Sequence, residues 1–300
     1  MIKKILIIGG NGFLGHNLAL VLAKLNYNLT LLCKKRKKTI KIKNAKYLFC
    51  NINKEKDLKS KLRNSYDCII NLSGNINHNN KRETYDIHFF ALRKLFKILD
   101  KGKIKLFIQA GSSLEYGKNK SPQKEKLKCK PLSHYAKAKY LTSKILMKQN
   151  DFKFIILRLY QVFGPYQKED RLIPITITSC LKSKKFKCTN GKQKRDFLYV
   201  NDFVDLIVKI LKRKKHISGI FNVGSGRPVQ VKLIIEKIHK IIKRGEPVFG
   251  ELKMRKEEIL SLYPDTNKVR RSFNWKPKVS ILAGINKTIK FYKKKYNLGV

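Results

Sequence analysis

Acidic side chains are scarce in this sequence of 300 residues, which has 20 Asp and Glu against 69 Lys and Arg and a formal net charge of +49. Such an excess favours either a phosphate-rich partner, such as RNA or an anionic surface, or a drift in composition. The basic residues run along the whole chain, and their densest clusters, at 34–38, 212–215 and 293–295, are short and contain no aromatic residue. The sequence shows no helix-turn-helix, zinc-finger or RNA-binding pattern. We therefore attribute the charge to composition and expect no specific nucleic-acid partner.

Long apolar runs are also missing. None approaches the roughly 20 residues that a membrane-spanning helix needs, and the apolar start of the chain is too short for a secretory signal. The six cysteines are scattered without a Cys-x-x-Cys pair, and the six histidines show no metal-ligand spacing. These absences predict a cytoplasmic protein with reduced thiols, no membrane span and no bound metal.

Short apolar runs alternate with helical spacing through the first half of the chain. Runs typical of buried strands lie at 1–8, 28–33, 45–49, 68–72, 106–110, 153–163 and 220–223. Helical patterns lie between them, and after 164 the pattern is irregular apart from helices near 233–243 and from 280. The alternation predicts an α/β fold, a doubly wound parallel sheet with a smaller C-terminal substrate lobe.

A glycine-rich segment, from Gly9 to Gly15, joins the first expected strand to the first expected helix. Glycines at 9, 12 and 15 permit a tight turn, a close approach of the backbone to a pyrophosphate and close helix packing. The N-terminus of the helix then faces the phosphates. The segment therefore predicts a dinucleotide-binding turn, although a plain strand–helix turn can carry the same glycines.

Three side chains further along have acid–base potential. Tyr135 and Lys139 are four residues apart and so share one face of a helix. An ammonium group lowers the pKa of a neighbouring phenol, although a helix rich in lysine shows this pair by chance as well. Ser112 follows the apolar run at 106–110 and precedes Tyr135 by 23 residues.

Together, these motifs resemble the extended short-chain dehydrogenase/reductase family, specifically its NAD(P)-dependent nucleotide-sugar epimerases, dehydratases and reductases. Further matches run along nearly the whole chain in the family's order, at 157–165, 171–174, 195–202, 221–226, 265–268 and 274–277. The resemblance implies a Rossmann-like fold. It places a dinucleotide-binding domain at 1–163 and 196–224, and a nucleotide-sugar-binding lobe at 164–195 and 225–300.

The resemblance also implies roles for individual residues. Tyr135 is the acid and base at a sugar hydroxyl or carbonyl, Lys139 lowers its pKa, and Ser112 shares the proton, while hydride passes between nicotinamide and a sugar carbon, usually C4. The residues expected to bind the dinucleotide are Gly9, Gly12, Phe13, Leu14, Gly15, Lys34, Arg36, Asn51, Ile52, Leu72, Ser73 and Gly74. Those expected to bind the nucleotide sugar are Ser113, Gln161, Arg195 and Asp265. Family members pair through the helix that carries the tyrosine, so a homodimer is expected.

The end of the second strand bears on the choice between NAD and NADP. NAD-specific members place an Asp or Glu there for the ribose diol. This chain has Cys33 followed by Lys34, Lys35 and Arg36, and these cations suit a 2′-phosphate. NADP is therefore favoured over NAD, although any loop of this chain would be basic.

The residues after Ser112 limit the reaction. Sugar 4,6-dehydratases carry an Asp-Glu pair immediately after this hydroxyl, whereas this chain has Ser113 and Leu114. Glu115 comes one position late, and in an extended strand it would point to the other side. The cysteine that follows the serine in combined 3,5-epimerase/4-reductases is absent as well.

The expected activity is therefore hydride transfer at C4, by a 4-epimerase that keeps NAD bound or by a 4-keto reductase that uses NADPH. The resemblance places such an enzyme in the supply of lipopolysaccharide or another surface glycan. The alternative belongs to a different class: a non-catalytic Rossmann-fold protein that binds RNA or an anionic surface through its charge.

Overall fold

The computed structural model describes residues 2–34, 41–62, 65–74, 80–254 and 258–298. The chain divides into two compact units, each assembled from segments that are distant in the sequence. The first unit comprises Met1–Asn119, Glu125–Leu159 and Val204–Asn222, and the second comprises Lys120–Lys124, Tyr160–Phe203 and Val223–Val300.

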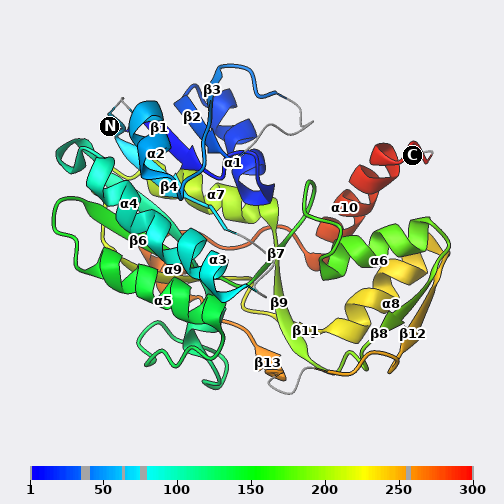
Figure 1. The fold of residues 1–300 in the computed structure, drawn as a ribbon. Helices are drawn as coiled ribbons and strands as arrows, with labels where there is room; N and C mark the ends of the chain where they lie inside the picture. The colour runs from blue at the N-terminus through cyan, green and yellow to red at the C-terminus, as the bar shows by residue number, and fades with distance from the viewer. Residues whose placement is uncertain (1, 35–40, 63–64, 75–79, 255–257, 299–300) are drawn as a thin grey trace. The chain divides into compact units, whose positions relative to one another are not determined.

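The first unit is built on a seven-stranded sheet with the order β10-β6-β5-β4-β1-β2-β3 (Figure 1). The neighbouring strands from β6 to β3 all pair in parallel. The strands are β1 (Lys4–Ile8), β2 (Asn28–Cys33), β3 (Ala45–Phe49), β4 (Cys68–Asn71), β5 (Leu106–Ser112), β6 (Lys153–Leu159) and β10 (Gly219–Val223). The predicted fold class, an α/β fold with a doubly wound parallel sheet, is confirmed.

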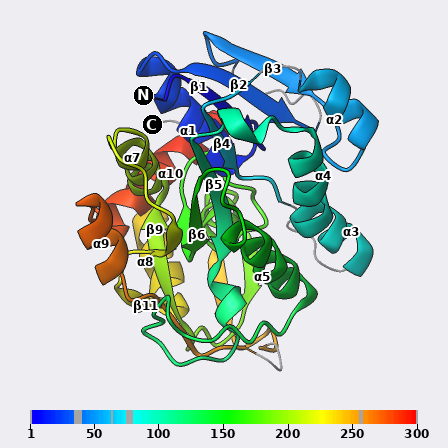
Figure 2. The same ribbon diagram turned by 90° about the vertical axis from the view of Figure 1, so that its left-hand side faces the viewer.

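Helices cover both faces of this sheet (Figure 2). The helical elements of this unit are α1 (Phe13–Lys24), α2 (Glu55–Lys61), α3 (Lys81–Tyr85), the π-helical turn η1 (Asp86–Phe90), α4 (Ala91–Ile98), the 3-10 turns η2 (Lys101–Lys103) and η3 (Ser113–Tyr116), and α5 (His134–Met147). Alternate strand residues point to opposite faces, so Leu6, Ile69 and Phe107 pack in one core with Leu58 of α2 and Leu95 of α4. This packing fixes the register of the sheet, because a slip of one residue would move every side chain to the opposite face and disrupt the packing against both helix layers.

The parallel pairing brings the carboxyl ends of the strands to one edge of the sheet. At that edge β1 ends at Ile8, β2 at Cys33, β4 at Asn71 and β5 at Ser112. Each of these ends leads directly into a segment that holds predicted site residues. The fold therefore gathers the candidate site of the first unit along one edge.

The second unit is organised around β9 (Lys194–Tyr199), which pairs in parallel with β7 and β13 and antiparallel with β11. The strands β8 and β12 form a separate parallel pair in the same unit. The remaining elements are β7 (Gln161–Phe163), α6 (Leu172–Leu181), β8 (Lys185–Cys188), β11 (Pro228–Gln230), α8 (Val231–Ile242), β12 (Glu246–Phe249), β13 (Ser261–Leu262), α9 (Asn267–Phe273) and α10 (Ile281–Lys295). Helix α7 (Val200–Leu211) begins in the second unit and ends in the first.

Two buried aspartates hold the second unit together. The Asp196 carboxylate accepts hydrogen bonds from the backbone N–H groups of Ser225, Gly226 and Arg227. The Asp202 carboxylate accepts from the N–H groups that precede α10, and its carbonyl oxygen accepts from the indole of the buried Trp275 at 3.0 Å. Backbone donors thus satisfy two carboxylates that are buried in the interior.

The units differ from the predicted domains at their edges. The apolar run at 153–163, expected as one strand, forms β6 in the first unit and β7 in the second, because the run breaks at Tyr160. The segment 196–203, expected in the first domain, lies in the second unit, because β9 pairs only with strands of that unit. The assignment of one unit to the dinucleotide and the other to the sugar stays a prediction.

Candidate functional site

The glycine-rich turn lies between β1 and α1, as the sequence predicts. Gly9 has a φ of +81°, which favours glycine, and a Cβ at Gly15 would lie 2.2 Å from the carbonyl oxygen of Gly9. Gly12 is the N-cap of α1, without a side-chain cap, and Phe13 and Leu14 open a first turn that has no acidic residue. The geometry fits a dinucleotide pyrophosphate, because the backbone is tightly folded and the positive helix end carries no competing anion.

The ends of β2 and β3 lie side by side and hold the next predicted residues. Cys33 is buried and Lys34 is exposed, while Arg36 lies outside the described residues. Asn51 and Ile52 are half-buried after β3, and the side-chain oxygen of Asn51 accepts the N–H of Asn53 at 3.1 Å. Of the cations expected to meet a 2′-phosphate, Lys34 lies within the described residues, directly after β2, and its contact with a phosphate stays a prediction.

The segment after β4 is held by a chain of amide and hydroxyl groups. The Ser73 hydroxyl donates to the side-chain oxygen of Asn71 at 2.6 Å, and the Asn71 amide donates to Gln109 of β5 at 2.9 Å. Leu72 and Gly74 flank this contact, and the backbone of Leu72 approaches the glycine turn so closely that a Cβ on Gly9 would lie 3.0 Å from its carbonyl oxygen. Two of the predicted cofactor-binding segments are therefore in contact.

Ser112, Tyr135 and Lys139 all lie in the first unit. Ser112 ends β5, and its hydroxyl oxygen accepts the N–H of Leu114 at 3.2 Å. The Lys139 ammonium donates to the carbonyl oxygen of Ala110, in the same strand, at 2.8 Å, and it lies 5.9 Å from the ring centre of Tyr135. Residues of β5 and of α5 are thus joined through Lys139, and its ammonium lies beside the phenol as the i, i+4 spacing predicts.

Lys139 is only 4% exposed, and burial lowers its pKa to about 8, against an opposing effect of the Glu115 carboxylate. Burial favours the neutral amine because the interior solvates a charge poorly. A lysine with this pKa is charged at neutral pH and loses its charge under mildly alkaline conditions. The site therefore holds a cation whose charge depends on pH in a range accessible to experiment.

The ring of His88 packs edge-on against Tyr135, with ring centres 4.9 Å apart. The hydroxyl of Thr142, on α5, donates to the carbonyl oxygen of His88 in the π-helical turn η1. A Cβ on Gly74 would come within 2.9 Å of this imidazole. His88 is therefore a buried residue between the helix that carries Tyr135 and the segment after β4.

The expectation that Glu115 lies in an extended strand is wrong. Residues Ser113–Tyr116 form the 3-10 turn η3, whose N-terminus is capped reciprocally by Ser112 and Glu115. The Glu115 carboxylate is fully buried and forms an ion pair with Arg158 of β6 at 3.0 Å. Ser113, predicted to bind the sugar, is 5% exposed in the same turn. The family match at 157–165 contains Arg158, but it does not indicate this ion pair, because Glu115 lies 43 residues earlier in the chain.

In the second unit, a cavity of about 470 Å³ contains one of the predicted sugar-binding residues. It is lined by Gln161, Arg171, Thr189, Gln193, Leu252, Lys253, Met254 and Glu258. Arg195, predicted to hold a diphosphate, is 8% exposed and pairs with Glu258 of this lining. Burial lowers the pKa of Arg195, and Glu258 opposes that effect. Sequence reasoning missed Glu258 because no local pattern connects it with an arginine 63 residues earlier.

Asp265, the last predicted sugar-binding residue, also lies in the second unit. Its carboxylate accepts the N–H of Asn267, at the start of α9, and its own N–H donates to Gln123, both at 2.8 Å. These contacts give Asp265 a structural use at the N-terminus of α9. A contact with the sugar stays a prediction.

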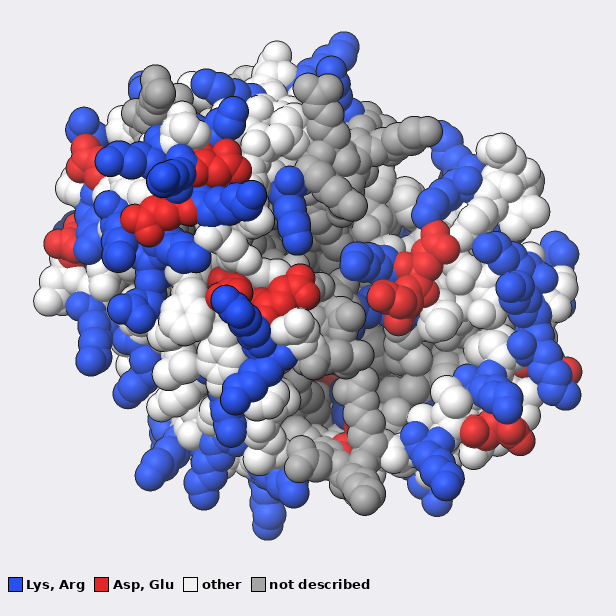
Figure 3. All heavy atoms as spheres, in the orientation of Figure 1, with Lys and Arg blue, Asp and Glu red and all other residues white. Residues whose placement is uncertain are grey.

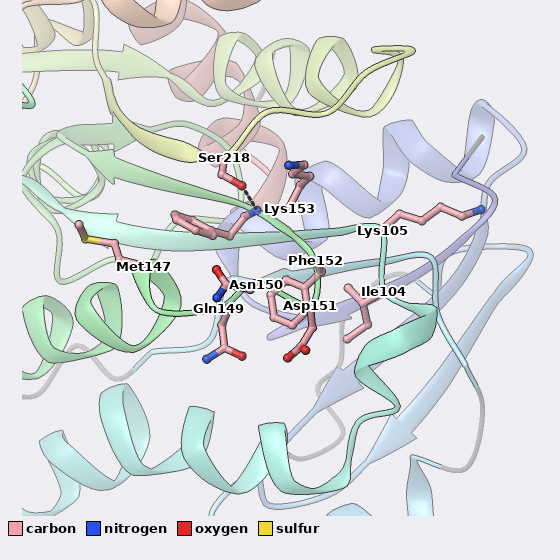
Figure 4. Close-up of a pocket in the computed structure, with 10 residues that line it drawn as sticks. Ile104, Lys105, Met147, Gln149, Asn150, Asp151, Phe152, Lys153 and Ser218 are labelled. Atoms are coloured by element: carbon pink, nitrogen blue, oxygen red, sulfur yellow. Dashed lines mark hydrogen bonds between the residues drawn. The ribbon is translucent and has the colours of Figure 1, made fainter.

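Another cavity, of about 430 Å³, lies at the opposite edge of the main sheet (Figure 4). Its lining includes Ile104 and Lys105 before β5, Phe152 and Lys153 at the start of β6, and Ser218. It is therefore at the amino ends of the strands whose carboxyl ends hold the candidate site. None of the predicted site residues lines it.

Two general expectations can be compared with the described residues. No helix among them is long and apolar enough to cross a membrane, and none of their His, Cys, Asp and Glu side chains form a group that could hold a metal ion. Lys and Arg side chains are spread over most of the face drawn in Figure 3, with Asp and Glu side chains among them.

Comparison with known proteins identifies relatives along the whole chain. CDP-abequose synthase of Salmonella muenchen is 28% identical over 296 residues, covering 96% of this chain and 97% of that protein. The solved structure of UDP-glucose 4-epimerase from Thermotoga maritima has a TM-score of 0.89 at 22% identity and covers 97% of this chain and 99% of its own. MoeE5, solved with UDP-glucuronic acid and NAD, has a TM-score of 0.88 at 19% identity and covers 98% and 100%. A model of the NAD dependent epimerase/dehydratase family matches residues 5–224, and the chain belongs to this family.

Proposed function

We propose that this enzyme transfers hydride at C4 of a nucleotide sugar, as a 4-epimerase or a 4-keto reductase. The observation that carries the proposal is the arrangement of Ser112, Tyr135 and Lys139, in which a buried ammonium lies beside a phenol and bonds to the strand that ends in the serine. Relatives named for UDP-glucose epimerisation and for CDP-abequose synthesis support a nucleotide-sugar substrate.

The three side chains have separate tasks in this proposal. Tyr135 takes the proton of a sugar hydroxyl as it is oxidised and returns a proton as a carbonyl is reduced. The Lys139 ammonium stabilises the phenolate and so lowers the pKa of Tyr135. The Ser112 hydroxyl donates to the same sugar oxygen. A bound NAD or NADP supplies the hydride acceptor and donor, held by the glycine turn and by the segments that follow β2, β3 and β4.

The sequence after Ser112 argues against a 4,6-dehydratase in this proposal. The two positions that would carry the Asp-Glu pair hold Ser113 and Leu114. Glu115, the next carboxylate, is fully buried and engaged by Arg158 and Ser143. A serine, a leucine and a fully buried, paired carboxylate lack the free acid and base that proton transfer at C5 and C6 of a sugar requires.

Replacing Tyr135 with Phe tests the acid–base role. We expect kcat to fall by about 10²–10⁴-fold, because proton transfer loses its donor and acceptor. Binding of the dinucleotide should stay within about twofold, since the ring and the backbone remain. Turnover is measured as interconversion of the two C4 epimers of a nucleotide sugar, or as oxidation of NADPH in the presence of a 4-keto nucleotide sugar.

Tyr140→Phe, on the same helix, is the matched control and should keep wild-type turnover. Full activity of Tyr135→Phe would contradict the acid–base role. A wild-type protein that binds neither dinucleotide but binds RNA with a steep dependence on salt would instead support the non-catalytic alternative.

The pH profile tests the charge on Lys139. Because its pKa is about 8, lowered by burial, kcat should be highest below that pH and fall above it, about tenfold per pH unit once the ammonium is lost. In Lys139→Arg the guanidinium stays charged, so any residual activity should lose this alkaline decline. An identical decline in that variant would show that another group controls it.

The proposed cofactor preference is NADP over NAD, and it rests on Lys34 and Arg36. Denatured protein is examined by mass spectrometry for a released dinucleotide, and emptied protein is titrated with NADH and NADPH. We expect an empty site and tighter binding of NADPH, with Lys34→Ala weakening NADPH alone by about 3–10-fold, as for the loss of one charged contact. Lys46→Ala, at an exposed lysine of β3, is the control. Tightly retained NAD would reject the NADP preference and favour an epimerase.

We also propose a homodimer that pairs through α5 and its neighbour. Phe90 at the end of η1 and Leu141 and Met147 on α5 are 38%, 37% and 49% exposed, and α5 packs against η1. Leu141→Glu should convert a species of twice 35.0 kDa into a monomer in sedimentation velocity, because an unpaired charge is costly inside an apolar interface. Leu233→Glu, on α8 and 45% exposed, should remain dimeric. A monomeric wild-type protein would disprove the assembly.

A further inference from the structure

Glu115 is a fully buried carboxylate that the proposed reaction does not use. One of its oxygens, Oε1, accepts the backbone N–H of Ser112 at 2.8 Å. The other, Oε2, accepts the hydroxyl of Ser143 at 2.9 Å and the Nε–H of Arg158 at 3.0 Å. A single carboxylate thus connects the end of β5, helix α5 and strand β6.

The surroundings hold this carboxylate in one position. Gly111 leaves room for it, because a Cβ there would lie 2.8 Å from Oε1. Its partner Arg158 is 2% exposed, lies 4.4 Å from the ring centre of Tyr116, and donates to the sulfur of Cys129 at 3.0 Å. Both members of the ion pair are therefore buried and held by further contacts.

The Glu115 carboxylate also affects the pKa of Lys139. Burial lowers the pKa of this lysine, and Glu115 is the charged group that raises it. Among the described residues, the titratable and charged groups around the two are Tyr135 of α5, Tyr116 of η3, Arg158 of β6 and Cys129 of the loop before α5. His88 of η1 packs against Tyr135, and Lys144 of α5 acts on Cys129. A neighbouring negative charge stabilises a buried ammonium, which the interior alone would favour in its neutral form.

We propose that Glu115 is a positioning residue that fixes the main chain of Ser112 and supplies the negative charge that keeps the buried Lys139 ammonium charged. Its effect on turnover rests on the proposed function, whereas its effect on Lys139 is a property of the folded chain alone. Glu115 has no exposed surface, so it acts through Ser112 and Lys139 and does not touch the substrate.

The test replaces Glu115 with Gln, which keeps an oxygen for the Ser112 N–H and removes the charge. Lysines are labelled with ¹³C at the ε carbon, and the Lys139 resonance is assigned by its absence in Lys139→Arg. We expect the wild-type resonance to titrate near pH 8 and the Glu115→Gln resonance at least about one pH unit lower. Glu55→Gln, at an exposed residue of α2, is the control and should leave the midpoint unchanged.

Because Glu115→Gln leaves Arg158 buried without its anion, this variant is prone to unfolding. The double variant Glu115→Gln/Arg158→Gln removes both charges and keeps side chains that form hydrogen bonds. We expect it to recover the melting temperature while the Lys139 midpoint stays below that of the wild type. An unchanged midpoint in either folded variant would overturn the proposal.

Turnover gives a separate reading. At pH 9, a folded variant without Glu115 should lose about tenfold in kcat with KM within about threefold, because a midpoint about one pH unit lower leaves about a tenth of the charged Lys139 at that pH. A wild-type protein that turns over no nucleotide sugar would refute the proposed function, and the NMR titration would still decide the role of Glu115. If the double variant regains full kcat along with its melting temperature, the ion pair contributes to stability alone, and the proposal is overturned.

Discussion

Parallel strand pairing is the constraint on which the candidate site depends. Strands that run in one direction bring their carboxyl ends to one edge, so four loops with different sequences meet there. The glycine turn after β1, Lys34 after β2, Ser73 after β4 and Ser112 at the end of β5 come from positions spread over more than a hundred residues. Packing on both faces keeps the strands in register, so these loops stay aligned with one another.

Sequence reasoning found the features that repeat along the chain. Buried parallel strands are short apolar runs, and the runs at β1, β2 and β5 are visible for that reason. A helix places Tyr135 beside Lys139 by its period alone. Such rules depend only on neighbours in the sequence, so a single chain is enough to apply them.

The features that sequence reasoning missed depend on residues distant in the chain. The turn at Glu115 closes because Arg158 of another strand neutralises the carboxylate, and nothing near Glu115 in the sequence indicates that partner. Arg195 likewise finds Glu258 from far along the chain. The apolar run at 153–163 looks like one strand in the sequence because both of its halves form largely buried strands. The two strands, separated at Tyr160, belong to different units.

The π-helical turn η1 has a geometric consequence for the helix that follows it. A π turn bonds over five residues and an α turn over four, so η1 contains one residue more than regular α geometry would need. Each residue of an α-helix turns the direction of the side chains by about 100°. The extra residue therefore sets the angular phase between α3 and α4. Deleting it would restore an unbroken α-helix and rotate the face of α3 that holds the buried Thr84 away from the side that now meets α5.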